Sequence, residues 1–142
     1  MDASFFHGVD GYGYGDYGRD QFDIIVARIL GAEAALVRLQ LFSGTHAIAS
    51  ALFGSLRPGN TMLCVSGPPY DTLEEVIGKR VGSQTGTLTG SLADWGIKYK
   101  EIDALYEDQA FKANGQNIAF DLDQMDKMIQ DDPSIKLIHI QR

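Results

Sequence analysis

Few features of this sequence are typical of disulfide-rich, zinc-binding or membrane-spanning proteins. Its 142 residues include one cysteine, Cys64, which excludes a disulfide framework and a cysteine-based zinc cluster. No apolar run approaches the roughly 18 residues that a membrane-spanning helix needs. The start, MDASFFHGVD, has no basic segment before an apolar run and so lacks the pattern of a signal peptide. These absences predict a soluble protein of the cytoplasm that does not act on membranes.

Positive charge is also scarce. The 12 lysine and arginine residues are outnumbered by 19 acidic ones, which gives a net charge of −7. Surfaces that bind nucleic acids or anionic membranes are usually basic, so neither partner is expected. The Gly- and Tyr-rich segment 8–20 has the composition of a disordered segment or of a stacking arm for single-stranded nucleic acid, and the acidic balance and its single arginine argue against the nucleic-acid function. The overall composition, 44% apolar and 22% charged, is ordinary for one globular domain or part of one.

Along the chain, segments whose apolar residues recur with the period of a helix alternate with segments that are typical of strands. Helices are expected at 20–31, directly after 43–45, at 71–78 and at 121–130, and strands at 35–41, 61–66, 97–102 and 136–141. Since the two kinds alternate, the sequence predicts an α/β fold with a mainly parallel sheet flanked by helices.

Residues at the ends of these segments support the assignment. Asp20 is a natural N-cap for the first helix and Gly31 a natural stop. Asp71 and Glu74 are spaced like a capping box. In the last helix, three apolar side chains are expected to face inward: Leu122, Met125 and Ile129.

The corner Ser43-Gly44-Thr45 joins an expected strand to an expected helix. Either these residues simply cap the helix, or the free N–H groups at its start bind an anion such as a phosphate. Tyr70 follows the strand at 61–66, and ligands of an open parallel sheet collect beyond the carboxyl ends of its strands. A phosphate site beside a flat ring suggests a nucleotide or pyridoxal phosphate, and the spacing does not decide between them.

Three segments carry a family resemblance: GYGYGDYGRD, LVRLQLFSGTHAIASALFGSLRPG and PYDTLEEVIG. Together they resemble the pyridoxal-phosphate proteins described as aluminium-resistance or methionine gamma-lyase-like, which are related to the cystathionine lyases. The resemblance covers 8–80 almost without a break and returns more loosely at GSLADWGIKY and KLIHIQR. One departure is Gly15, where the family usually has aspartate. The resemblance implies part of the large domain of a type I pyridoxal-phosphate-dependent transferase fold, with an arm at 1–19 and the first part of the cofactor-binding domain at 20–142.

The resemblance also implies site residues for pyridoxal 5'-phosphate. Ser43, Gly44 and Thr45 would hold the phosphate, and Tyr70 would stack on the pyridine ring and help to move a proton. Tyr14 and Arg19 would reach from the arm to the phosphate of a neighbouring subunit. This implies a homodimer or homotetramer with shared sites and a small amino-acid substrate.

Other polar or reactive residues are expected to have structural roles. His46 lies on the first turn of its helix, where capping or packing competes with ligand contact. His7 and His139 are isolated, so no metal site is expected. Cys64 lies in an apolar strand and reads as an inert buried thiol, and Arg38 is expected to pair with a carboxylate.

The lysine and the acid that such an enzyme needs have no counterpart in this sequence. In the family, the Schiff-base lysine and the acid facing the pyridine nitrogen both lie beyond Arg142. The expectation is therefore an N-terminal-side fragment, inactive alone, of a carbon–sulfur lyase for β- or γ-elimination on amino acids such as cystathionine or methionine. Two alternatives stay open: another pyridoxal-phosphate reaction on the same scaffold, and a truncated non-catalytic protein that binds a phosphorylated ligand or a partner subunit.

Overall fold

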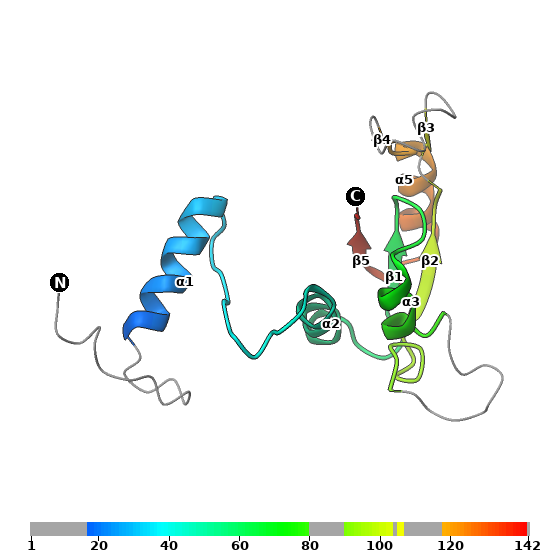
Figure 1. Cartoon of the computed structure of the whole chain (residues 1–142). Helices are drawn as coiled ribbons and strands as arrows, with labels where there is room; N and C mark the ends of the chain where they lie inside the picture. Colours follow the sequence, from blue (N-terminus) through cyan, green and yellow to red (C-terminus); the bar gives the residue numbers. More distant parts are fainter. Residues whose placement is uncertain (1–16, 80–89, 104, 107–117, 142) are drawn as a thin grey trace. The chain divides into compact units, whose positions relative to one another are not determined.

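The computed structural model describes residues 17–79, 90–103, 105–106 and 118–141. The chain forms two compact units, of which the first ends at Gly44 and the second begins at Thr45 (Figure 1). None of the described helices is both long and apolar enough to cross a membrane.

The first unit contains one helix, α1 (Tyr17–Leu30). It begins before the predicted start, so Asp20 lies inside the first helical turn and is not the N-cap. Gly31 ends the helix as predicted, because its φ of 65° suits glycine and its N–H donates to the Arg28 carbonyl at 3.2 Å. Arg19 accordingly belongs to the first turn of α1.

The predicted strand at 35–41 is wrong. The segment has no strand hydrogen bonds, and Leu41 N–H closes a turn onto the Arg38 carbonyl at 3.1 Å. The Val37 N–H, which a strand ladder would use, donates to the Asp23 carboxylate at 2.8 Å. Leu39 is 97% exposed, so the alternating apolar residues do not line a sheet face in this structure. Alternation alone does not form a strand, since a strand needs a neighbour to pair with.

The second unit is built on a parallel three-stranded sheet in the order β2-β1-β5. The central strand β1 (Thr61–Cys64) is fully buried, with β2 (Lys98–Glu101) and β5 (Ile135–His139) on either side. Three predicted strands are therefore confirmed, each shorter than expected. Cys64 lies opposite both Glu101 and His139, so this register marks the carboxyl edge of the sheet.

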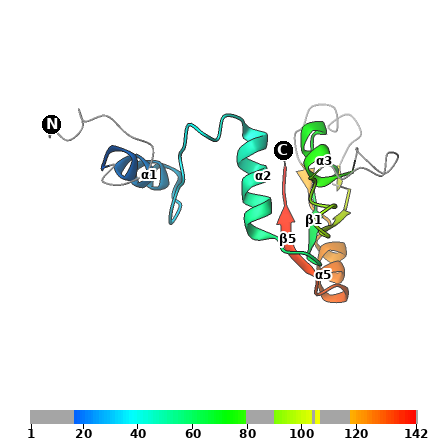
Figure 2. The same cartoon turned by 90° about the horizontal axis from the view of Figure 1, so that it is seen from below.

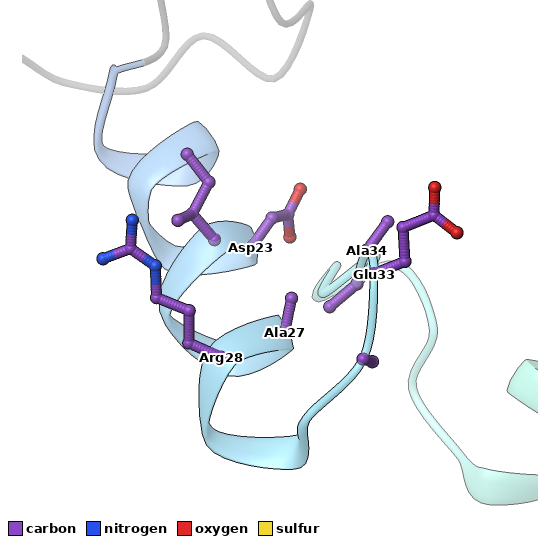
Figure 3. A pocket seen from close by; sticks show the side chains of 8 residues that line it. Asp23, Ala27, Arg28, Glu33 and Ala34 are labelled. Carbon is purple, nitrogen blue, oxygen red and sulfur yellow. The ribbon is translucent and has the colours of Figure 1, made fainter.

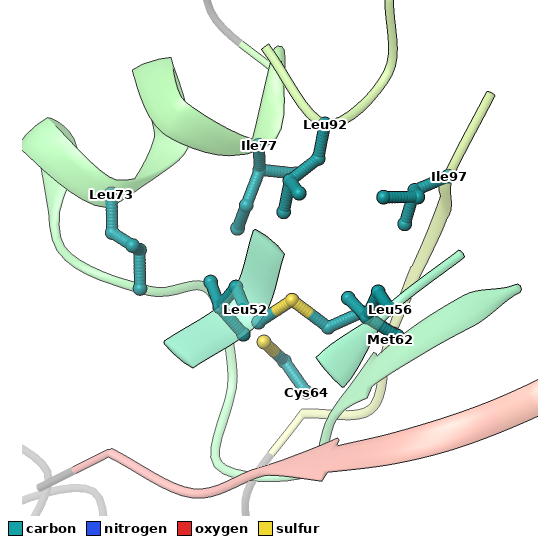
Figure 4. Packing of buried hydrophobic residues seen from close by; sticks show 8 residues of the cluster. All are labelled: Leu52, Leu56, Met62, Cys64, Leu73, Ile77, Leu92 and Ile97. Atoms are coloured by element: carbon teal, nitrogen blue, oxygen red, sulfur yellow. The ribbon is translucent and has the colours of Figure 1, made fainter. Parts of the chain in front are cut away.

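Helices cover both faces of this sheet (Figures 1 and 2). One face packs against α2 (Gly44–Ser55) and α3 (Asp71–Ile77). Figure 4 shows the resulting cluster, in which Leu and Ile side chains of the helices meet β1 and the 92–97 segment: Leu52, Leu56, Met62, Cys64, Leu73, Ile77, Leu92 and Ile97. The second unit is thus a small α/β domain with a parallel sheet flanked by helices, as the alternation of elements predicts.

The other face packs against α5 (Leu122–Asp131). Asp121 caps this helix by accepting a hydrogen bond from Gln124 N–H at 2.9 Å. Of the three side chains predicted to face inward, only Met125 packs against the core; Leu122 is 59% and Ile129 36% exposed. Met128 packs there as well, so the buried face is rotated relative to the prediction.

A short antiparallel pair, β3 (Leu105–Tyr106) and β4 (Ile118–Ala119), is not predicted by the sequence. Two residues are too few for a recognisable alternation of apolar and polar side chains.

Candidate functional site

Tyr70 lies where the chain leaves the carboxyl end of β1 and enters α3. It is the N-cap of α3, with extended backbone angles, and its carbonyl accepts from Leu73 N–H at 3.0 Å and Glu74 N–H at 3.1 Å. The predicted capping box is wrong by one position, because Asp71 is already the first helical residue and accepts from Thr72 N–H at 2.9 Å. The side chain of Tyr70 is partly buried and packs against the core cluster shown in Figure 4.

Three hydroxyl groups meet beside Tyr70. The Thr45 Oγ1 lies 3.0 Å from the Tyr70 hydroxyl and 3.1 Å from the Thr72 Oγ1, and in each pair either atom can donate. Thr45 belongs to the first turn of α2, so the contact joins the start of α2 to the start of α3. The structure therefore brings together two residues predicted for the site, Thr45 and Tyr70.

The carboxyl end of β5 closes the same edge. Gln141 donates its backbone N–H to the Ser66 Oγ at 2.9 Å, and its Oε1 accepts from Tyr70 N–H at 3.4 Å. The sequence prediction missed Gln141, Ser66 and Thr72. Gln141 follows an expected strand just as Tyr70 does, so the rule for carboxyl ends of parallel strands could have identified it.

The other two residues of the predicted phosphate corner belong to the first unit. Ser43 is exposed, and Gly44 begins α2. A Cβ added at Gly44 would meet no atom within 4 Å, so the backbone there is open to an approaching group. Tyr14, predicted for the phosphate of a neighbouring subunit, lies outside the described residues.

Arg19 lies beside a hollow in the first unit. The hollow has a volume of about 300 Å³ and is lined by two arginines and three other residues: Arg19, Leu36, Arg38, Gln40 and Leu41. Arg38 binds both carboxylate oxygens of Asp23 at 2.8 Å, which confirms its predicted structural pairing. The pKa of Asp23 is lowered, and the hydrogen bond from the Val37 N–H is the largest cause. Burial raises this pKa, whereas Arg38 and Arg19 lower it further.

A second hollow of about 250 Å³ lies between α1 and the segment after it (Figure 3). Asp23 and Ala27 face the segment that carries Ala34, whereas the charged ends of Arg28 and Glu33 point away. Half of its lining residues are alanines, and the Asp23 carboxylate is already bound by Val37 and Arg38, so this hollow is not a candidate site.

The buried thiol of Cys64 is 3.5 Å from the His139 Nδ1. Burial raises the pKa of Cys64 to about 11 and lowers the pKa of His139, so both groups are neutral near pH 7. Cys64 is thus buried as predicted, without the thiolate that reactive cysteines need. Among the described residues, no group of three or more histidine, cysteine or acidic side chains could hold a metal ion.

This arrangement is that of an α/β domain with polar side chains at the carboxyl edge of a parallel sheet, where such folds bind small molecules. The chain belongs to the methionine gamma-lyase family, whose sequence pattern matches residues 1–142.

Relatives of known structure carry related names. All of this chain aligns, at 46% identity and a TM-score of 0.82, with a carbon–sulfur lyase involved in aluminium resistance from Clostridium novyi NT. A Clostridium acetobutylicum protein, described as a candidate cystathionine beta-lyase involved in aluminium resistance, is 42% identical with a TM-score of 0.81. The chain covers 31% and 30% of these two proteins. It is also 54% identical over 93 residues, 66% of its length, to the uncharacterized protein YnbB of Bacillus subtilis (strain 168), of which it covers 21%.

Proposed function

We propose that this chain provides the phosphate- and ring-binding half of a pyridoxal-phosphate-dependent carbon–sulfur lyase. The observation that carries the proposal is the 3.0 Å contact between Thr45 and Tyr70, which joins the phosphate corner to the aromatic residue assigned to the cofactor ring. The lyase names of the related structures support the reaction class. The substrate is proposed to be a sulfur-containing amino acid such as cystathionine or methionine.

The residues present fit pyridoxal 5'-phosphate. The ring of Tyr70 is supported by the core and only partly buried, as a stacking platform requires. Gly44 leaves room for a phosphate at the start of α2, where backbone N–H groups and the helix dipole favour an anion. Ser43 and Thr45 add hydroxyl groups, and the Arg19 guanidinium, whose planar fork suits phosphate oxygens, would come from the partner subunit.

Each residue has a distinct part in the proposed reaction. The cofactor, when bound, supplies a conjugated ring that accepts electron density from the substrate Cα. Tyr70 keeps that ring in a fixed plane, and its hydroxyl can exchange a proton with Thr45 and, through it, with Thr72. We propose that this hydroxyl holds a proton for the departing sulfur group. The Schiff-base lysine is expected beyond Arg142, as the family resemblance implies.

Substitution of Tyr70 tests the proposal in the complete protein that carries this chain. Tyr70→Ala should weaken the affinity for pyridoxal 5'-phosphate several-fold, because a stacking contact contributes on the order of 1 kcal/mol. Tyr70→Phe keeps the ring and should largely retain the cofactor while lowering the rate of thiol release. Affinity is measured by titrating the apo-protein with pyridoxal phosphate, and thiol release with cystathionine or methionine as substrate.

Tyr106→Ala offers a control at a tyrosine of β3, which belongs to the two-stranded sheet and not to the parallel one. Equal cofactor affinity in the wild type and in Tyr70→Ala would show that Tyr70 does not stack on the ring. Absence of cofactor binding in the wild type would overturn the proposed function as a whole.

A further inference from the structure

We infer that Gln141 is a positioning residue for Tyr70, because it supplies from the end of β5 the acceptor that holds the Tyr70 backbone at the carboxyl edge of the sheet. The inference rests on the proposed function, in which Tyr70 carries the cofactor ring. It concerns a residue that contacts Tyr70 and acts through it.

The need for this acceptor follows from the local sequence. Pro68 and Pro69, which precede Tyr70, have no backbone N–H, so the Tyr70 N–H is the first backbone donor after them. At an N-cap this N–H has no partner inside its own helix. A capping box would satisfy it with a Glu or Gln at the third helical position, but that position is Leu73 in α3. Instead, the acceptor comes from the residue after β5: the Tyr70 N–H donates to the Gln141 Oε1, with a distance of 3.4 Å between the nitrogen and the oxygen.

Gln141 is itself held in place. Its backbone N–H donates to the Ser66 Oγ at 2.9 Å, so the residues that follow β1 and β5 are linked in both directions. The distance of 3.4 Å to Tyr70 is at the long end for an N–H···O bond, and the expected effect is correspondingly moderate.

Tyr70 is therefore fixed at two points. Gln141 holds its backbone and Thr45 holds its hydroxyl, which together restrict the plane of the ring between them. A ring that is ordered before the cofactor arrives loses less conformational freedom on binding, and this favours affinity. Gln141 should thus influence cofactor binding only as long as the Tyr70 ring is present.

The first experiment needs no cofactor. Amide hydrogen exchange is measured in the complete protein for the wild type, Gln141→Met, which removes the acceptor at similar length, and Gln141→Glu, which keeps an acceptor. The Tyr70 N–H should exchange faster in Gln141→Met and near the wild-type rate in Gln141→Glu. Gln130→Met, at an exposed glutamine of α5, is the matched control and should change nothing at Tyr70. Equal Tyr70 exchange in the wild type and in Gln141→Met would overturn the inference.

The second experiment is a double-mutant cycle with pyridoxal phosphate as the probe. Gln141→Met should weaken cofactor affinity about three- to tenfold, the range that one hydrogen bond supports. In the Tyr70→Ala background, the same change should have no further effect. An equal loss in both backgrounds would show that Gln141 acts independently of Tyr70 and would overturn the inference. If the wild type binds no cofactor, the proposed function fails, while the exchange experiment still decides the positioning role.

Discussion

Asp132 shows how a single residue gains its properties from neighbours both near and distant in sequence. Asp132, which follows α5, binds Lys100 of β2 at 2.7 Å and accepts from the Ser134 hydroxyl at 2.6 Å and the Ser134 N–H at 3.0 Å. The Lys100 ammonium is the largest of the causes that hold the pKa of Asp132 well below its usual range. The ionised carboxylate thus connects the end of α5 to an edge strand of the sheet.

This pairing predicts a loss of stability in acid. Because the folded state keeps the pKa of Asp132 below its unfolded value of about 3.9, the carboxylate stabilises the fold fully above that value. The contribution should be lost as the pH falls through the lower folded pKa. Urea unfolding of the wild type and Asp132→Asn at pH values from 7 down to 3 measures the onset of this loss, which begins below the unfolded pKa. Asp132→Asn should be less stable at pH 7 and lose less stability on acidification.

Asp131→Asn is the matched control, since Asp131 is the adjacent acidic residue and is exposed. It should follow the wild-type pH profile. The same profile in Asp132→Asn and in the wild type would show that the Lys100 pair does not couple to folding.

The individual helices and strands show why part of the fold is predictable from the sequence and part is not. The strand at 61–66 is recognisable because a buried parallel strand is an apolar run bounded by turns. The helix at 121–130 is recognisable because its apolar residues recur with the helical period. The strand predicted at 35–41 fails because the Val37 N–H binds Asp23 of α1, a competition that the pattern of apolar residues does not contain. Local signals thus identify an element only when its partners agree with them.

Gly78, which ends α3, is a second element-scale feature. It has a φ of 91°, and a Cβ there would lie 2.6 Å from the Ser91 Oγ and 2.9 Å from the Ala93 Cβ. Gly78→Ala should therefore add a clash to the backbone strain. Gly59→Ala is the matched control, because Gly59 has a φ of 88° and open space around its Cα. The strain shared by both variants is about 1–2 kcal/mol.

The extra loss of unfolding free energy in Gly78→Ala, relative to Gly59→Ala, should be about 1–3 kcal/mol, the typical cost of overpacking. Chemical denaturation of both variants measures the difference. Equal losses would mean that the segment after α3 moves away from Gly78 at little cost.

At the scale of the whole molecule, we predict that the site is completed by a second copy of the protein. Arg19, on the first turn of α1, is proposed to reach the phosphate held at Ser43-Gly44-Thr45 of a partner subunit. In a C2 dimer, each subunit would lend its arginine to the other. Two inactive variants of the complete protein, Arg19→Ala and a substitution of the Schiff-base lysine expected beyond Arg142, should then complement each other when mixed and re-dimerised.

Random pairing under this symmetry should restore up to about a quarter of the wild-type activity, because one site of each heterodimer has both intact residues. Activity with cystathionine or methionine measures the recovery, and native mass spectrometry shows whether heterodimers are present. Heterodimers without recovered activity would show that Arg19 serves its own subunit.

The candidate site was predictable to the extent that its residues follow local signals. Thr45 is predicted from the start of an expected helix and Tyr70 from the end of β1, and the structure brings their hydroxyl groups together although the strand expected before Thr45 is absent. Gln141 also follows an expected strand and could have been found by the same rule, but its contact with Tyr70 depends on β5 lying directly beside β1, a pairing that spans much of the chain. The sequence indicates which segments form strands, whereas the order of strands in the sheet depends on tertiary packing.

The central position of β1 also has a consequence for the order in which the chain is made. Its two neighbours, β2 and β5, are both synthesised after it, and the last of them ends at His139. While the ribosome is still translating the segment before β5, one edge of β1 has unpaired backbone groups and the Tyr70 N–H lacks its acceptor. The nascent chain therefore exposes an apolar strand edge, a common target for mispairing and for chaperones, until Gln141 has left the ribosome.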